Sequence, residues 1–355
     1  MSKLHQSRKR INEINQELTT LFEERMKIVE DVVAYKKEEN LPVLDSTREK
    51  EVLKETKAYV KDATLIPYQQ QFMQTLMDIS KDYQQLLLGK DIVAYQGVAG
   101  AFSHIAARKC YPNFQLIPLP SFEDLFQAVS KNEAHFALVP FENSYTGEIG
   151  EVLDLLYHYD VSIQRFYDLK VEQNLIGIPG TKIEDIKQVY SHSQALQQSL
   201  PFLKTLNVEL IPFENTALAA KYIYELGDAS KAAIAAKETA EIYHLETLQE
   251  NIHASSDNTT RFIVIAKELN LDGNYISIQF TTKHEAGELS KIIQIISSYG
   301  FNLESIKSRA SKKEAWQYHF YLEIQANPNV PQTQEMLEEI KKVAINLKIT
   351  GIFNR

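Results

Sequence analysis

The chain has 355 residues, 44% of them apolar and 24% charged, a globular composition long enough for two or three domains of roughly 100 to 200 residues. A net charge of −9 argues against a general nucleic-acid or membrane surface, since either partner would need a basic face, and implies that local cations hold any anionic substrate. The single cysteine, Cys110, excludes an intramolecular disulfide and, with no secretory leader and no apolar run that could span a bilayer, predicts a cytoplasmic location.

Residues 1–41 contain no glycine or proline and are predicted to form one long helix. Their apolar side chains recur at the three- and four-residue steps of an amphipathic helix: Ile11, Ile14, Leu18, Leu21, Ile28 and Val32. Such a helix would be about 50 Å long, too long to be covered by two shorter helices of the same chain. We therefore expect a dimer that forms through this helix.

Two further helices are expected before residue 89. Pro42 ends the first helix, and Ser46 with Glu49 matches a capping box at the start of the second. Pro67 suits the first turn of the third, which is predicted to end at Gly89. Residues 1–88 are thus predicted to be an all-α domain of three helices.

Strand-like and helical runs alternate over residues 91–268, which predicts an α/β domain with mostly parallel sheets. The clearest strand-like runs are Ile92–Tyr95, Gln115–Leu119, Phe136–Val139 and Gln188–Tyr190. Residues 274–355 are predicted to be strand, helix, strand, strand, helix, strand, the α+β ferredoxin-like order. Its expected elements are Tyr275–Thr281, Gly287–Ser298, Leu303–Arg309, Trp316–Gln325 and Gln332–Asn346, followed by a last strand.

The first helix carries cations in its apolar stripe. Arg25 stands where a hydrophobic residue is expected, and a charge there is costly unless it is paired. Lys36 lies eleven residues further on nearly the same side, so both could hold one elongated dianion. Arg8 is about 25 Å from Arg25 along the helix axis, so only a partner chain could bring it to the same ligand.

This pattern resembles the all-helical chorismate mutases over the whole segment. By position, the resemblance assigns eight site residues: Arg8 from the partner chain, Arg25, Lys36, Asp45, Arg48, Glu49, Ser80 and Gln84. It implies that the arginines bind carboxylates or order that network, that Lys36 and Gln84 face the ether oxygen, and that the other three surround the hydroxyl and ring. The rearrangement transfers no proton, so fixed geometry and preorganised donors suffice, without metal or cofactor.

Four segments of the α/β domain place glycines or small polar side chains beside strand ends. These segments are Gly97–His104, Val139–Gly147, Tyr190–Gln198 and Asn258–Phe262. A glycine turn that leads into a helix can bind an anion through backbone N–H groups, and ligands of open α/β sheets bind at the carboxyl ends of strands. The wide separation of His104 and His192 argues against a metal site.

Together and in this order, the four segments resemble those of prephenate dehydratases, over roughly residues 91–268. The resemblance implies two α/β lobes hinged around a cleft, as in periplasmic binding proteins. It assigns Thr260 to the leaving hydroxyl and Asn143, Ser191 and Gln198 to substrate binding, while the role of Glu142 stays open. Loss of water and CO₂ from prephenate is driven by aromatisation, so a positioned donor at the departing oxygen is sufficient.

The C-terminal segment resembles an ACT domain, a sensor of small molecules that responds to phenylalanine in such enzymes. Half of each family motif is present, in Gly287–Ser290 and Lys307–Ala310. The implied effector site comprises Gly287, Leu289, Asn302, Leu303, Ser308 and Arg309. The altered positions predict weakened affinity, and a structural dimerisation module is the alternative.

The resemblances together predict a bifunctional enzyme of phenylalanine biosynthesis. Its substrates would be chorismate and prephenate, its effector phenylalanine and its assembly a homodimer or homotetramer, with no cofactor, nucleic acid or membrane as a partner. Two alternatives stay open. The second domain could act on arogenate, the aminated analogue of prephenate, or the chain could be a solute-binding sensor without catalysis.

Overall fold

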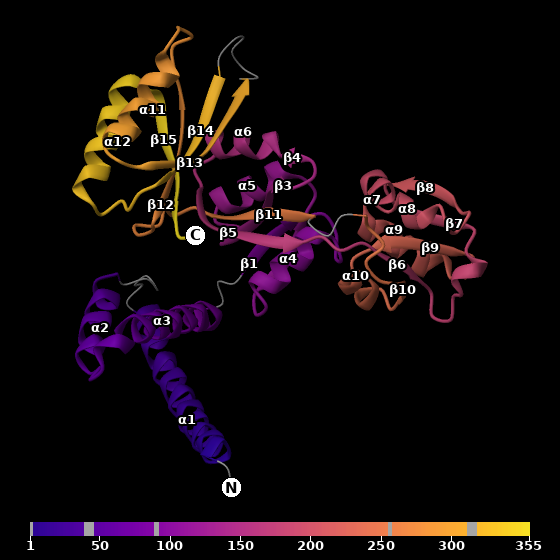
Figure 1. Ribbon diagram of the computed structural model, residues 1–355, viewed down its shortest axis with the longest axis horizontal. Helices are drawn as coiled ribbons and strands as arrows, with labels where there is room; N and C mark the ends of the chain where they lie inside the picture. The colour runs from indigo at the N-terminus through magenta and orange to yellow at the C-terminus, as the bar shows by residue number, and fades with distance from the viewer. Residues whose placement is uncertain (1–2, 39–45, 89–91, 255–257, 311–317) are drawn as a thin grey trace. The chain divides into compact units, whose positions relative to one another are not determined.

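A computed structural model describes residues 3–38, 46–88, 92–254, 258–310 and 318–355 (Figure 1). The chain divides into two compact units, Met1–Asp91 and Ile92–Arg355. Within the described ranges, we find no helix with the length and apolar character that a bilayer crossing requires.

The described residues of the first unit are helical, as predicted. The elements are α1 (Lys3–Glu38), α2 (Ser46–Ala58), a 3-10 turn (Ala63–Leu65) and α3 (Ile66–Leu88). Pro67 lies in the first turn of α3, where its missing N–H costs nothing. Both α1 and α2 pack against α3.

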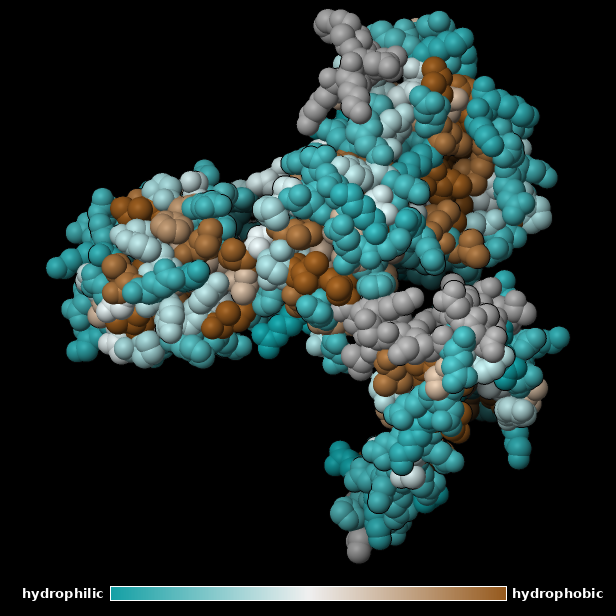
Figure 2. Space-filling model, turned by 180° about the vertical axis from the view of Figure 1, so that it is seen from behind, coloured by the Kyte–Doolittle hydropathy of each residue, from teal (hydrophilic) through white to brown (hydrophobic). Residues whose placement is uncertain are grey.

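Most of the apolar stripe of α1 has no cover within one chain. Its members Ile11, Ile14, Leu18, Leu21, Ile28 and Val32 are between 40% and 60% exposed. Among the described side chains of α1, only Val29 and Val33, near its C-terminal end, are buried, and Met77 of α3 is buried as well. Figure 2 shows this helix from a mostly hydrophilic side. A long amphipathic helix with an exposed apolar stripe fits association with a second copy.

The second unit begins with two α/β lobes. The first lobe contains β1 (Ile92–Gln96), α4 (Phe102–Cys110), β2 (Gln115–Leu119), α5 (Phe122–Ser130), β3 (Phe136–Asn143), β4 (Gly147–Glu148), α6 (Gly150–His158), β5 (Ser162–Lys170) and β11 (Thr259–Ala266). The second lobe contains β6 (Asn174–Gly177), a 3-10 turn (Ile183–Asp185), β7 (Gln188–His192), α7 (Ser193–Gln198), α8 (Leu200–Leu203), β8 (Glu209–Phe213), α9 (Thr216–Leu226), β9 (Lys231–Ala235), α10 (Lys237–Ile242) and β10 (Glu246–Gln249). Two crossings join the lobes, from β5 to β6 and from β10 back to β11 (Figure 1).

The prediction of mostly parallel sheets was wrong, because both sheets are mixed. In the first lobe β2, β1 and β3 are parallel, whereas β11 is antiparallel to both β3 and β5. In the second lobe β8, β7 and β9 are parallel, and β6 and β10 add antiparallel pairs. The physical reason is the double crossing, since β5 leaves the first lobe and β11 returns to it beside β5 in the opposite direction.

The C-terminal part has the predicted βαββαβ order. Its elements are β12 (Tyr275–Thr281), α11 (Glu288–Ser298), β13 (Asn302–Ala310), β14 (Tyr318–Gln325), α12 (Pro331–Val343) and β15 (Ile345–Phe353). The sheet order is β13-β14-β12-β15, and α11 and α12 cover one face (Figure 1). Trp316 lies outside the described residues. The second helix was predicted to reach Asn346, but it ends at Val343 because Ala344 takes extended dihedrals.

These four strands continue the sheet of the first lobe, and together they form one ten-stranded sheet. Gly351 of β15 pairs with Ile163 of β5, and a Cβ at position 351 would lie 2.8 Å from the Ile163 side chain, so glycine permits the approach. On the face opposite α11 and α12, Gln279 donates to the Leu153 carbonyl of α6 at 2.9 Å. Tyr321 of β14 is buried against Phe141 of β3 with ring centres 5.5 Å apart.

Candidate active sites

Polar residues line the contact between α1 and α3. Arg25 Nε donates to Ser80 Oγ at 3.2 Å, and Lys36 Nζ donates to Gln84 Oε1 at 3.1 Å. Ser80 and Gln84 are 4% and 8% exposed, and Gln84 Nε2 donates to the Ser80 carbonyl at 3.3 Å. The two cations that interrupt the stripe are therefore paired with neutral groups one turn apart on α3. Because the Ser80 hydroxyl does not cancel the positive charge of Arg25, this contact between the helices can bind an anion.

Glu49 is tied to the same helix. Lys81 of α3 bridges Glu49 at 2.9 Å and Asp78 at 2.8 Å. Burial lowers the pKa of Lys81, but the hydrogen bonds and attraction of the two carboxylates outweigh it, so the pKa is raised overall. Sequence reasoning did not single out Lys81, since a lysine on a helix surface is usually solvated.

The other residues that the resemblance assigns to the mutase site are Arg8, Asp45 and Arg48. Arg48 is exposed and pairs with Glu51 at 3.1 Å. Arg8 is exposed near the start of α1, and Asp45 lies outside the described residues. Within one chain, the structure thus brings together Arg25, Lys36, Ser80 and Gln84.

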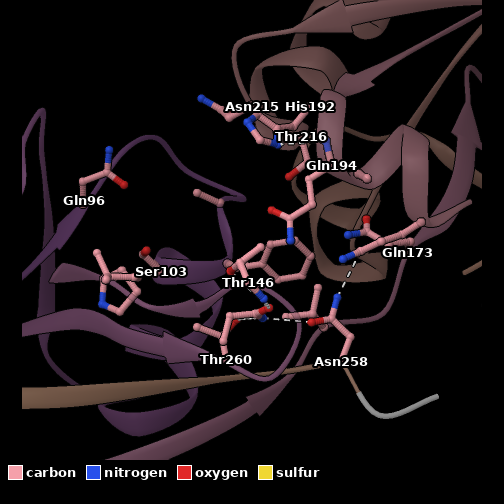
Figure 3. Close-up of a pocket in the computed structure, with 18 of the residues that line it drawn as sticks. Gln96, Ser103, Thr146, Gln173, His192, Gln194, Asn215, Thr216, Asn258 and Thr260 are labelled. Carbon is pink, nitrogen blue, oxygen red and sulfur yellow. Dashed lines mark hydrogen bonds between the residues drawn. The ribbon is translucent and has the colours of Figure 1, made fainter. Parts of the chain in front are cut away.

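A cavity of about 290 Å³ lies between the two lobes of the second unit (Figure 3). Gln96 and Ser103 approach it from the first lobe, and His192, Gln194 and Asn215 from the second. Its polar lining consists of amide, hydroxyl and imidazole groups. Among the residues that the structure describes, no Lys, Arg, Asp or Glu lines it. The expectation that local cations hold an anionic ligand was therefore wrong for this cavity.

Two helix N-termini lie at this cavity. Ala101, the residue before α4, makes no side-chain cap, and Ala101 to Ser103 line the cavity from the first lobe. Across from them, Asn215 and Thr216 line it at the N-terminus of α9. The helix dipole favours anions at both places, although at α9 the Asn215 side chain already accepts from the Leu218 N–H at 2.8 Å. Carboxylates can therefore bind without a charged side chain.

Three residues expected from the sequence meet at one end of this cavity. Asn143 Nδ2 lies 2.9 Å from Thr260 Oγ1 and 2.8 Å from Asn258 Oδ1, and Asn258 Nδ2 donates to Gln198 Oε1 at 3.1 Å. The Asn143 oxygen accepts from the N–H of Tyr145 at 2.9 Å, which fixes the orientation of the amide. Because Asn143 donates to Thr260, the threonine hydrogen is left for a ligand.

Ser191, the fourth expected residue, is not among the residues that line the cavity. It is fully buried, and its hydroxyl donates to the Ile234 carbonyl at 2.7 Å. The next residue, His192, does line the cavity. Successive side chains of a strand point to opposite faces, so only one of the two can reach the ligand side.

Two buried amide atoms in the described lining make no hydrogen bond. Gln198 Nε2 and Gln173 Oε1 have no hydrogen bond within the described part of the chain, although the residues are only 8% and 3% exposed. An unmade bond at a buried amide costs about 1 to 3 kcal/mol, so both atoms are suited to a polar ligand. Gln173 lies in the segment that connects β5 of the first lobe to β6 of the second, and it belongs to none of the predicted motifs. A polar residue in a short connection between two strands is the sequence signal that could have identified Gln173.

Helix α10 of the second lobe and the residue after it hydrogen-bond to the turn at Gly97–Gly100 of the first lobe. Thr239 Oγ1 donates to the Gly100 carbonyl at 2.7 Å, and Tyr243 OH donates to the Ala99 carbonyl at 2.8 Å. Gly100 has φ +85°, and a Cβ there would lie 2.9 Å from Thr239. Burial lowers the pKa of His104, whose neutral Nδ1 accepts from the Gly100 N–H at 3.1 Å. These contacts fix the turn that precedes the N-terminus of α4.

A second cavity, of about 580 Å³, lies in the βαββαβ part. Of the six expected effector residues, Gly287, Leu289 and Ser308 line it. Asn302 and Leu303 pair with β14 at the start of β13, away from this lining.

Arg309 also lies elsewhere. Its Nη2 pairs with Asp154 of α6 at 3.3 Å, and a Cβ at Gly150 would overlap its guanidinium group. Arg309 thus joins the C-terminal part to the first lobe.

Comparisons with known proteins match the whole chain. The family model Prephenate dehydratase matches residues 93–270, and Chorismate mutase type II matches residues 7–85. A bifunctional chorismate mutase/prephenate dehydratase of Aquifex aeolicus is 33% identical, over 99% of this chain and 98% of that protein. An arogenate dehydratase/prephenate dehydratase of Arabidopsis thaliana is 33% identical over 74% of this chain and 71% of that protein. A prephenate dehydratase of Arthrobacter aurescens, solved in complex with L-Phe, is similar in fold with a TM-score of 0.68 and 24% identity, covering 74% of this chain and 90% of that one.

Proposed function

The chain belongs to the family of bifunctional chorismate mutase/prephenate dehydratases, and from this premise we propose which residues carry each activity and what regulates them. As a member of this family, it is an enzyme of phenylalanine biosynthesis that rearranges chorismate to prephenate and converts prephenate to phenylpyruvate, not a sensor without catalysis. We assign the mutase to residues 1–88, the dehydratase to residues 91–268 and a regulatory ACT domain to residues 274–355.

In the mutase, Arg25 and Lys36 hold the dianion in its compact, chair-like form. Lys36 and the free hydrogen of the Gln84 amide face the ether oxygen, where negative charge builds as the C–O bond breaks. Arg8 reaches this site from a second chain. The exposed apolar stripe of α1 supports a homodimer or a homotetramer, because it would be covered by the same helix of a partner.

In the dehydratase, the N-termini of α4 and α9 and the Gln198 Nε2 group hold the substrate carboxylates. The bond to the ring carboxylate breaks, its electrons enter the ring, and the ring hydroxyl departs and takes up a proton, giving CO₂, water and phenylpyruvate. Thr260 donates to that departing oxygen and Asn143 orients Thr260. The observation that carries this assignment is the 2.9 Å contact between these two side chains at the cavity.

Prephenate is the proposed substrate rather than arogenate. Arogenate carries an ammonium group, and no carboxylate lines the cavity within the described ranges to pair with it. A ratio of kcat/KM values for the two substrates tests this assignment. Preference for arogenate would overturn it.

The interlobe contacts of α10 predict a cost in substrate binding. Thr239→Val with Tyr243→Phe removes two hydrogen bonds to the glycine turn without changing side-chain volume much. At about 1 kcal/mol each, we expect the KM for prephenate to rise roughly tenfold or more, while mutase activity stays unchanged. Tyr190→Phe is the matched control, because its hydroxyl bonds Gln188 within the second lobe. A double variant that behaves like the control would contradict a role in lobe positioning.

Phenylalanine is the proposed effector, and the cavity of the C-terminal domain is its proposed site. Gly287 has φ +91° and precedes α11, so backbone N–H groups lie open to a carboxylate there. The L-Phe complex of the Arthrobacter aurescens relative supports this choice. Glu288 places a negative charge beside the same helix start, so we expect weakened affinity.

Calorimetry with phenylalanine tests this regulation. Ser308→Tyr should fill the cavity and abolish both the binding heat and the inhibition of dehydratase. Ser298→Tyr, at an exposed position near the end of α11, is the control and should bind like the wild type. Point variants are preferable to deleting the domain, because deletion would expose buried Phe141. If millimolar phenylalanine produces no binding heat, the domain has a structural role and not a regulatory one.

A further inference from the structure

One pair of strands presents two different sets of side chains on its two faces. In the antiparallel pairing of β3 with β11, Thr260 lies opposite Asn143, and Arg261 lies opposite Glu142. Because neighbouring residues of a strand point to opposite sides, Thr260 and Asn143 face the interlobe cavity while Arg261 and Glu142 face away from it. Glu142 is accordingly not among the residues that line the interlobe cavity.

On that far face, Glu142 is held from two sides. Arg261 Nη1 lies 3.1 Å from Glu142 Oε1, and Lys307 Nζ lies 2.6 Å from Glu142 Oε2. Arg261 is fixed in turn by Asp168 of β5, with contacts of 2.8 and 3.0 Å. Lys307 also lies 4.0 Å from Glu148. Both carboxylate oxygens of Glu142 are thus engaged by cations.

Lys307 comes from the C-terminal domain. It is on β13, its side chain is only 14% exposed, and its ammonium lies 5.3 Å from the centre of the Phe141 ring. Partial burial makes such a pair stronger than a surface salt bridge, because water screens it less. The C-terminal domain therefore contacts two consecutive residues of β3, Phe141 and Glu142, directly before Asn143.

We propose that Lys307 is a positioning residue for the dehydratase reaction, which holds Glu142 against Arg261 and thereby sets the distance between Asn143 and Thr260 on the other face. This inference rests on the proposed roles of Asn143 and Thr260. Without Lys307, Glu142 Oε2 loses its cation, and β3 is free to shift against β11. A small shift at a donor that must meet the departing oxygen lowers the rate of the chemical step.

The expected signature is a loss in kcat with little change in KM. Among the described residues, the helix N-termini that hold the carboxylates make no hydrogen bond or ion pair with this ion network, and Gln198 connects to Asn143 only through Asn258, so substrate binding persists. Lys307→Gln should lower dehydratase kcat about tenfold or more and leave KM within roughly twofold. Mutase activity of the same protein should not change. Lys307→Arg keeps the charge and should restore most of the rate.

A double-mutant cycle decides between positioning and a general loss of stability. Lys307→Gln, Glu142→Gln and the double variant are compared with Lys341→Gln, which breaks an exposed pair with Glu338 in the same domain. If Lys307 acts through Glu142, the double variant should be no slower than Glu142→Gln alone. Additive losses, or a Lys307→Gln protein with wild-type kcat, would overturn the inference.

Thr260→Val in the same assay separates this inference from the function it rests on. If Thr260→Val retains turnover, the assigned role of Thr260 is wrong. If Thr260→Val is inactive while Lys307→Gln is normal, only the role of Lys307 is wrong.

Discussion

Replacing Thr260 by valine should lower dehydratase kcat/KM by about 100- to 10,000-fold, because the variant lacks the only group assigned to donate to the departing oxygen. Valine keeps the shape of the side chain, so the strand pair should stay intact. Asn143 would retain its contacts with Asn258 and with the Thr259 carbonyl, so the structural cost is that of one hydrogen bond. Phenylpyruvate formation is followed by absorbance while prephenate formation from chorismate is measured in parallel.

Prephenate should then accumulate, since the mutase residues lie in the separate first unit. Thr259→Val is the matched control, because the same change one residue earlier lies outside the lining of the interlobe cavity. Equal loss of both activities in a folded protein would mean that the two sites are not independent. Near-normal phenylpyruvate formation would remove Thr260 from the mechanism.

The order of elements could be predicted from local patterns, because long uninterrupted periodicities have one structural solution. The absence of glycine and proline in the first 41 residues predicted α1, and the alternation of strand-like and helical runs in residues 274–355 predicted the βαββαβ order. Strand direction could not be predicted in this way. Whether β11 is parallel or antiparallel to β3 depends on the chain crossing between lobes twice, which no local pattern encodes.

Asn143, Gln198 and Thr260 could be placed at one site because each lies at the end or beginning of a strand or in the adjacent helix. Ser191 shows the limit of this reasoning. Motif residues are adjacent in sequence, but the two-residue period of a strand separates Ser191 from His192, and only packing decides which one faces the ligand.

Two further features could not be predicted from the sequence: the backbone groups at the cavity and the contacts between domains. Net charge predicted cationic side chains at the dehydratase cavity, whereas its described lining has no Lys or Arg and includes the N-termini of α4 and α9. Composition carries no information on backbone N–H groups. Arg309 was assigned to the effector site from its motif. Within one chain its side chain pairs with Asp154 of the first lobe, a contact that depends on how the C-terminal strands pack on α6.

Removing the positive charge at Arg25 should cost the mutase about 3 to 4 kcal/mol of transition-state stabilisation, which is a 100- to 1000-fold loss in kcat/KM. Arg25 donates to the buried hydroxyl of Ser80 and interrupts an apolar stripe, so Arg25→Leu should be no less stable than the wild type. The comparison of melting temperature with mutase rate separates the two effects. Arg10→Leu, which removes exposed pairs with Glu13 and Glu17, is the control and should retain full activity.

Mixing two inactive variants tests whether the site is shared between chains. If each site combines Arg25 of one chain with Arg8 of the partner subunit, a heterodimer of Arg8→Ala and Arg25→Ala chains has one intact site and one doubly damaged site. After random exchange half of the dimers are heterodimers, so about a quarter of the wild-type activity should return. Subunits shown to exchange without any recovery would place Arg8 outside the site and leave the exposed stripe of α1 as a dimer contact alone.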